Sequence, residues 1–305
     1  MALADHRLAN PVIVEVPPET RTPKSDGVGA WLQITPLMTV LTLFLVVPIV
    51  TIAVVSFWGY NEWSFFPDFT LENYEYHLTA KVTWQTYLTT VKYVVLTWVF
   101  TVVIGFTVAY FLAFHVRSMT WQIALFLVCT IPFWTSNIIR MISWIPFLGR
   151  EGLANNALLA VGAIDKPLDF LLFSDFAVIL AFVHLYSLFM VVPIFNTMMR
   201  IDKSLIEAAR DAGASGFQTL TNVIIPLSKP GIMIGSIFVV TLVMGDFITV
   251  RFMSGSQSAS VGRLIQNEIS LLQYPAAAAS AVVLLITVLL MIGIMMRFVN
   301  IRKEL

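Results

Sequence analysis

The sequence has 305 residues, of which 58% are hydrophobic and 12% are charged, and it carries no net charge. A soluble domain usually has about twice that share of charged residues, so we expect most of the chain to lie in a membrane. Without a basic excess there is no clustered Lys and Arg to hold a nucleic acid, and that class of partner is excluded. Cys129 is the only cysteine, which excludes a disulfide framework or a thiolate metal site within one chain.

The first 29 residues are polar and rich in proline. They lack the short apolar core and the small-residue cleavage site of a signal peptide. We interpret residues 1–29 as a polar N-terminal tail, and residues 30–305 as one transmembrane domain.

Gaps between consecutive charged residues predict the membrane spans, because a helix that crosses a bilayer needs about 20 predominantly apolar residues. The chain offers six such segments, so the predicted fold is an all-α integral membrane protein with six transmembrane helices. The expected spans cover about residues 32–57, 89–114, 119–140, 176–199, 230–250 and 275–297.

Six spans put both termini on the same side of the membrane. If that side is the cytoplasm, the inner loops and tails carry the majority of the 18 Lys and Arg residues, as the positive-inside rule requires. We therefore predict a multi-pass protein with cytoplasmic N- and C-termini. The polar segment between the fourth and fifth spans, residues 200–229, is then a cytoplasmic insert.

The stretch IPFWTSNIIR interrupts the third span. Pro132 is expected to break the helix, and polar residues that follow it, such as Asn137, are tolerated at that depth where they line a cavity or are buried in protein. Trp134 and Trp144 could each offer a face to a cation, worth roughly 0.5–2 kcal/mol, although a place in the interfacial aromatic belt is the alternative. Arg140 argues against a simple cation site and could pair with a lipid phosphate or with an acid on a neighbouring helix.

Asp246 stands within the fifth span, where an acid is a functional hypothesis because its burial is costly. At about 1.5 Å per residue it lies about 24 Å from Pro230, near the outer end of the span. A place in the substrate pathway and an ion pair with Arg251 at the membrane boundary are equally good interpretations. His184 has no Asp, Glu, Cys or second His at metal-ligand spacing, so we expect a packed, hydrogen-bonded histidine and no metal site.

The cytoplasmic insert contains the stretch SLIEAARDAGASGFQTLTNVIIPLSKPG. Ser204 with Glu207, and Ser215 with Gln218, have the spacing of a capping box at a helix start. We predict a helix from about Leu205 to Ala212 and a second from about Gly216 through Ile225. A glycine at position 213 provides the turn, and Pro226 closes the second helix, with Pro230 in the first turn of the fifth span.

The spacing within this insert resembles the EAA signature of ABC importer permeases. Glu207, Ala208 and Ala209 are followed by Gly213 and by an apolar-x-apolar-Pro ending at Pro226. The resemblance implies the type I ABC importer permease fold in a bacterial inner membrane. It also implies that residues 200–229 form a coupling helix unit that docks on a separate ATPase subunit, with these five residues as the ATPase-coupling positions.

The chain has no Gly-x-x-x-x-Gly-Lys-[Ser/Thr] and no Gly-Lys pair, so the loop that cradles ATP phosphates is missing. We expect no catalytic residue and no cofactor in this chain. The family resemblance implies that ATP and Mg are bound by the partner ATPase.

Four stretches are similar to the permease of spermidine/putrescine importers: IPFWTSNIIR, LIEAARDAGAS, IIPLSKPGI and YPAAAASAVVLLITV. This resemblance implies a polyamine substrate, a second homologous permease, an ATPase pair and a periplasmic solute-binding protein. Candidate pathway residues are Trp134, Asn137, Trp144 and Asp246.

The same permease class also serves other small organic cations, opines, metals and anions, and these cargoes stay open. A secondary transporter is an alternative of another class, expected to show repeated halves, and no such repeat is apparent. A membrane enzyme would need a paired nucleophile and base or clustered ligands, which an isolated Asp246 does not supply.

Overall fold

The computed structural model describes residues 27–61 and 64–297. Within these residues the chain forms two compact units, divided between Ile49 and Val50, which are described separately below. The tail expected over residues 1–29 lies outside the described residues except for its last three, which begin the first helix.

The N-terminal unit is helical. It contains α1 (Gly27–Leu41), the π-helical turn η1 (Thr42–Val46) and the start of α2 (Val47–Val55). Inside α1 the Thr35 and Thr39 hydroxyls donate to main-chain carbonyls four residues earlier, across 2.7 and 2.8 Å. Because these hydroxyls are satisfied within the helix, the segment presents few free polar groups to lipid.

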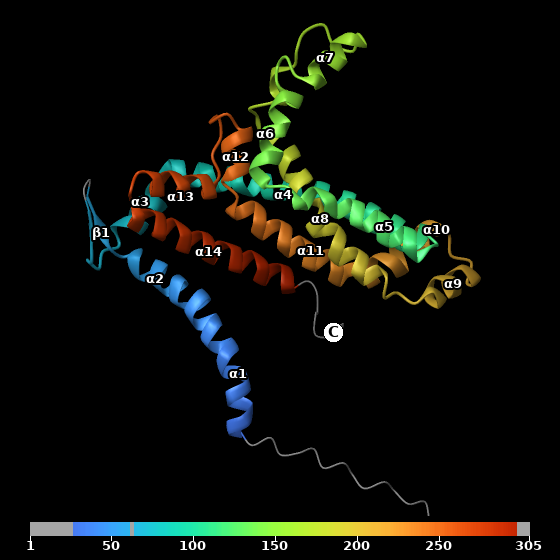
Figure 1. The fold of residues 1–305 in the computed structure, drawn as a ribbon, viewed down its shortest axis with the longest axis horizontal. Helices are drawn as coiled ribbons and strands as arrows, with labels where there is room; N and C mark the ends of the chain where they lie inside the picture. The colour runs from blue at the N-terminus through green and yellow to red at the C-terminus, as the bar shows by residue number, and fades with distance from the viewer. Residues whose placement is uncertain (1–26, 62–63, 298–305) are drawn as a thin grey trace, which may run out of the picture. The chain divides into compact units, whose positions relative to one another are not determined.

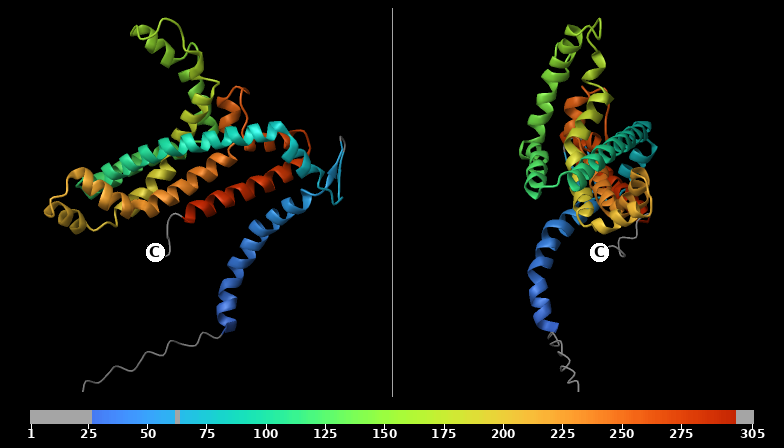
Figure 2. Two further views of the ribbon diagram at one scale, coloured as in Figure 1. Left: turned by 180° about the vertical axis from the view of Figure 1, so that it is seen from behind. Right: turned by 90° about the vertical axis from the view of Figure 1, so that its right-hand side faces the viewer.

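The second unit begins with the rest of α2 and continues into a short antiparallel hairpin of β1 (Gly59–Tyr60) and β2 (Phe65–Phe66), followed by α3 (Glu72–Thr79). Its centre is a bundle of three long helices that pack on one another, visible in two views (Figures 1 and 2). These are α4 (Lys81–Tyr110), α8 (Asp175–Met198) and α11 (Ile225–Gly245). The last helix, α14 (Tyr274–Arg297), packs against α11.

Glycines let the three central helices approach closely. A Cβ atom on Gly105 of α4 would lie 2.6 Å from Cγ of Met190 in α8, and one on Gly231 of α11 would lie 2.5 Å from the Pro193 carbonyl oxygen. Small residues at such contacts are typical of membrane helix pairs, whose association depends on van der Waals packing.

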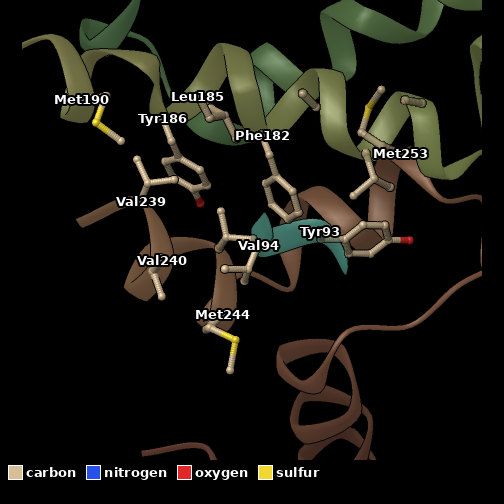
Figure 3. Close-up of a cluster of buried hydrophobic side chains, with 14 of the residues drawn as sticks. Tyr93, Val94, Phe182, Leu185, Tyr186, Met190, Val239, Val240, Met244 and Met253 are labelled. Carbon is tan, nitrogen blue, oxygen red and sulfur yellow. The ribbon is translucent and has the colours of Figure 1, made fainter. Parts of the chain in front are cut away.

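The core between these helices is continuous and apolar. Figure 3 shows Tyr93 of α4, Phe182 and Met190 of α8, and Val239 and Met244 of α11 converging from the three helices, and all five side chains are fully buried. Close packing of this kind fixes α4, α8 and α11 as the frame that positions the shorter elements.

The third predicted span is broken, as expected at Pro132. A helix α5 (Met119–Thr130) leads into a 3-10 turn, η3 (Ile131–Trp134), and then into α6 (Asn137–Leu148) and α7 (Leu153–Ala160). The two halves are bent by 90°. Within the described residues, five helices are long and apolar enough to cross a membrane, and six spans result if this bent pair counts as one.

Short elements occupy the two ends of the bundle. The insert follows α8 and consists of α9 (Lys203–Asp211), α10 (Gly216–Thr219) and the π-helical turn η5 (Leu220–Ile224), which leads into α11. At the opposite end, called the far end below, lie α12 (Ile248–Met253), α13 (Val261–Ser270) and α3 (Figure 1). Two further turns are η2 (Phe111–His115) and η4 (Asp169–Leu171).

Candidate coupling surface and translocation site

The first helix of the insert begins earlier than its capping pattern predicts. Asp202, not Ser204, is the N-cap: its Oδ1 accepts from the Ser204 backbone N–H across 2.9 Å. The capping box expected between Ser204 and Glu207 is therefore wrong, because an aspartate two residues upstream is an equally strong cap and adds two residues to the helix. Hydrogen bonds from Ser204 hold the pKa of Asp202 below its usual value.

The second helix of the insert begins as predicted. The Gln218 N–H donates to Ser215 Oγ across 3.3 Å, and the Ser215 N–H donates to Gln218 Oε1 across 2.8 Å, which completes the capping box. Between the two helices Gly213 has φ of +82°, in the left-handed region that favours glycine. The Ala214 N–H then donates to the Ala209 carbonyl across 3.0 Å and closes the turn.

The prolines do not end the second helix, and that expectation is wrong. Residues Gly216–Gly245 form one uninterrupted helical segment that contains both Pro226 and Pro230. Proline lacks an amide hydrogen and crowds the carbonyl four residues earlier. The π-helical turn η5 ends at Ile224, two residues before Pro226, and contains Asn222, whose carbonyl the ring would crowd. The wider backbone of a π-helical turn accommodates the ring. The insert is thus continuous with a membrane helix.

Four of the exposed side chains of the insert are called the insert surface below. Glu207 and Ala208 belong to the predicted coupling positions and are exposed. Leu205 is 48% exposed and Phe217 is 74% exposed. The latter two were not singled out by sequence, although a large apolar residue within a polar insert is a usable signal of a protein contact. Ala209 and Pro226 are half-buried.

Asp246 lies at the far end, in the break between α11 and α12. Its Oδ2 accepts from the Tyr186 hydroxyl across 2.6 Å and from Thr249 Oγ1 across 3.0 Å, and its Oδ1 accepts from the Thr249 N–H across 2.7 Å. No ion pair joins Asp246 to Arg251 in the described structure. The carboxylate therefore ties α8 to the start of α12, while the side chain stays partly accessible.

Trp144 and His184 lie together on α6 and α8. The indole N–H of Trp144 donates to His184 Nδ1 across 3.2 Å, and the two rings meet edge to face. The expectation of a packed, hydrogen-bonded histidine at position 184 is confirmed. The residues described contain no group of three or more His, Cys, Asp or Glu that could hold a metal ion.

An open cavity of about 290 Å³, called the Arg140 pocket below, is lined by Arg140, Ser143, Trp144, Phe147 and His184. Asn137, at the start of α6, accepts a hydrogen bond from Arg140 Nη2 across 2.5 Å. The structure thus brings two predicted pathway residues, Asn137 and Trp144, to the same arginine. Trp134 is 84% exposed on η3 and does not line this pocket.

A second polar cluster at the far end was not visible in the sequence. His77 on α3 and Glu268 on α13 are both buried, with His77 Nε2 3.5 Å from Glu268 Oε1 and 3.1 Å from the Ala276 carbonyl oxygen. Burial raises the pKa of Glu268 to about 7 and lowers that of His77. Because both shifts favour the uncharged forms, the contact is weaker than an ion pair between a full carboxylate and an imidazolium.

Comparison with known proteins identifies the class. The family described as "Binding-protein-dependent transport system inner membrane component" matches residues 31–302. The chain belongs to this family, and it is a multi-pass inner-membrane permease of an ABC importer.

Particular relatives are similar over most of the chain. The spermidine/putrescine transport system permease protein PotB of Salmonella typhimurium (strain LT2) is 34% identical over 259 residues, which cover 84% of this chain and 89% of the relative. PotB of Escherichia coli (strain K12) is 34% identical over 254 residues, covering 83% and 91%. PotC of the same strain is 31% identical over 104 residues, covering 34% and 39%.

Solved structures share the fold. A crystal structure of a bacterial alginate ABC transporter, in complex with an alginate-bound periplasmic protein, superimposes with a TM-score of 0.73 at 16% identity, covering 90% of this chain and 94% of that chain. The predicted all-α, type I permease fold is confirmed. At that identity the likeness concerns the fold alone.

Proposed function

We propose that this chain is a permease subunit of a polyamine importer and forms part of the translocation pathway for spermidine or putrescine. The observation that carries the proposal is the similarity to PotB, at 34% identity over most of both chains. The insert supports the transport class independently, because its two capped helices, tight turn and exposed apolar side chains form a rigid docking element.

The insert surface is the proposed contact with a separate ATPase pair. Glu207 offers a polar contact, Ala208 and Ala209 permit close approach, and Gly213 makes the turn that holds α9 against α10. Pro226 lies where the insert joins α11, so a displacement of the insert is passed to a membrane helix without a flexible joint. ATP and Mg are bound by that ATPase, and this chain is non-catalytic.

Docking of the insert on a cytoplasmic ATPase sets the proposed orientation of the chain in the membrane. The insert end then faces the cytoplasm, as do both termini, and the far end faces the periplasm. A periplasmic solute-binding protein delivers the substrate there. A second homologous permease completes the pathway, and the similarity of this chain to both PotB and PotC supports a pair of related subunits.

At the far end, Asp246 and Trp144 supply the chemistry that a polyamine requires. A carboxylate attracts an ammonium group, and an indole face attracts a cation by roughly 0.5–2 kcal/mol. Asn137 adds an amide, while Trp134 offers an exposed indole at the bend of the third span. Asp246 keeps part of its surface accessible although Tyr186 and Thr249 hold it in place.

A second candidate cargo is an anionic or zwitterionic solute of the same importer class. It is favoured by Arg140, a cation in the wall of the pocket that contains Trp144. A positive wall repels a polyamine and attracts a carboxylate.

The test is a ligand screen of the binding protein that associates with the purified complex, followed by uptake into proteoliposomes containing ATP. The proposal expects spermidine or putrescine to raise the melting temperature of the binding protein and to be taken up only when ATP is present. Stabilisation by a carboxylate-bearing solute and not by polyamines would favour the second candidate. Uptake without an ATPase would contradict the importer assignment itself.

A further inference from the structure

Arg140 is a buried cation whose hydrogen bonding is incomplete. The side chain is 9% exposed, and its guanidinium lies over the Phe133 ring, 5.4 Å from the centroid. One nitrogen, Nη2, is bonded to Asn137, but Nε and Nη1 have no acceptor among the residues that the structure describes. A guanidinium cannot be deprotonated in a protein, so this charge is permanent.

The described part of the chain supplies no counter-charge. Its ion pairs are His77 with Glu268, Lys92 with Asp175 and Arg150 with Asp169, and none involves Arg140. Asp246 directs its carboxylate to Tyr186 and Thr249 instead. A buried charge without a partner is strongly destabilising, whereas a hydrogen-bonded ion pair offsets most of the cost.

The Arg140 pocket is the route by which a counter-charge can reach the guanidinium. Ser143 and the rings of Trp144, Phe147 and His184 form its other walls, and Trp144 and His184 already satisfy each other. Phe147, one of the lining residues, is 44% exposed, so an apolar ring reaches the surface at this pocket. A pocket with one cation and ring-lined walls, one of them exposed, fits a single carboxylate carried on an apolar helix.

We propose that an aspartate or glutamate of the second permease subunit enters the Arg140 pocket and neutralises this guanidinium. The inference rests on the proposed function, because it requires a paired permease. A protein carboxylate is favoured over a transported solute because the charge of Arg140 is present throughout the transport cycle, whereas a solute leaves on every turn. A carboxylate also matches the planar fork of guanidinium donors.

The first experiment maps what occupies the pocket while Arg140 stays intact. Phe147 is replaced by p-benzoylphenylalanine, the assembled complex is irradiated in its native membrane, and the product is identified by mass spectrometry. The expected product joins Phe147 to a membrane helix of the second permease, within a turn of an Asp or Glu. A product with a phospholipid, with the binding protein or with this chain alone overturns the proposal, as does the lack of any product.

The same photo-reactive residue at Phe217, on the insert surface, is the matched control. It should capture the ATPase, which tests the proposed function and not the pocket. Capture of the ATPase at Phe217 without capture of a permease at Phe147 overturns the pocket proposal alone. A wild-type complex that contains neither an ATPase nor a second permease overturns both.

The second experiment tests the charge. Arg140→Glu should lower the amount of second permease that co-purifies with this chain by about tenfold or more, because two carboxylates then meet in a desolvated contact. Arg140→Lys keeps the charge and should retain most of the co-purifying second permease. Replacing the mapped partner carboxylate by Lys should restore assembly of Arg140→Glu, and failure of that charge exchange overturns the ion pair.

Discussion

The hydroxyl of Tyr186 donates a hydrogen bond of 2.6 Å to Asp246 Oδ2, which joins the middle of α8 to the end of α11. The same carboxylate caps α12 through the Thr249 N–H. An acid that first looks like a lone charge in a span is thus a junction of three helices. The Asp246 carboxylate has two roles, as a helix cap and as a negative charge, and each role is tested by a different substitution.

Asp246→Asn separates these roles. With the amide oxygen at the Oδ1 position, the asparagine still accepts from the Thr249 N–H, and its NH2 group at the Oδ2 position can donate to the Tyr186 hydroxyl oxygen. We therefore expect the complex to assemble normally, while loss of the charge lowers uptake at limiting polyamine severalfold. The measurement is the initial rate of ATP-dependent uptake, normalised to the amount of assembled complex. Tyr186→Phe keeps the charge and removes one hydrogen bond, so it should mainly lower the melting temperature. If Asp246→Asn leaves uptake unchanged, the charge of Asp246 has no role in transport and the residue serves only as a helix cap.

Gly231 is expected to tolerate no side chain. A Cβ atom there would lie 2.5 Å from the Pro193 carbonyl oxygen and 2.6 Å from Thr197 Oγ1, whereas one on Gly293 of α14 would meet nothing within 4 Å. Overpacking of this kind costs about 1–3 kcal/mol, while alanine in an open helical position gains up to about 1 kcal/mol over glycine. Gly231→Ala should therefore lower the melting temperature in detergent and Gly293→Ala should not. Equal stability of the two variants would contradict the packing seen between α8 and α11.

Glu268 predicts a pH dependence of stability. Its folded pKa is raised to about 7 from the usual value of 4.5, so the folded state holds a proton that the unfolded state releases, and stability falls as the pH rises through 7. Between pH 6.5 and about 8 the loss is about 1 kcal/mol. His77 has a lowered pKa and contributes the opposite trend, which fades as the pH rises above its usual value of 6.5 and leaves the upper part of the range to Glu268.

The measurement is the melting temperature of the purified complex across that range. Glu268→Gln, which mimics the protonated acid, should lack the decline and should be more stable than the wild type at the upper end. Glu75→Gln changes an exposed glutamate on α3 and should behave like the wild type. If Glu268→Gln retains the full decline, another group causes it.

Features set by local sequence could be predicted, because their physics acts over a few residues. The apolar segments, the break at Pro132, the turn at Gly213 and the capping box of Ser215 all depend on neighbours within one helical turn. The errors in the insert have a local cause as well. Asp202 competed with Ser204 as the cap, and a π-helical turn accommodated Pro226 where a helix end was expected.

Contacts between distant segments could not be predicted from one sequence. His77 and Glu268 are 191 positions apart and meet only because α3 and α13 both pack against α14. The sequence shows that Arg140 lies at membrane depth. Whether its guanidinium nitrogens find an acceptor depends on which acidic side chains the fold brings near it, and one sequence does not reveal this. The charge and the membrane depth of Asp246 could be predicted, whereas its hydrogen bond to Tyr186 depends on the packing of α8 on α11.

Gly213 gives the most direct test of the coupling function. Its φ of +82° lies where a β-branched residue is strained by about 1–2 kcal/mol. Gly213→Val should therefore reorient α9 relative to α10 without affecting the membrane helices. We expect the complex to keep hydrolysing ATP while the polyamine imported per ATP falls severalfold, and Glu207→Ala to act in the same direction. Gly216→Ala is the matched control, since Gly216 has no positive φ and a Cβ atom there meets nothing within 4 Å. Both rates are measured in the same proteoliposomes. If Gly213→Val transports with the wild-type ratio, the shape of the insert is not what couples the two activities.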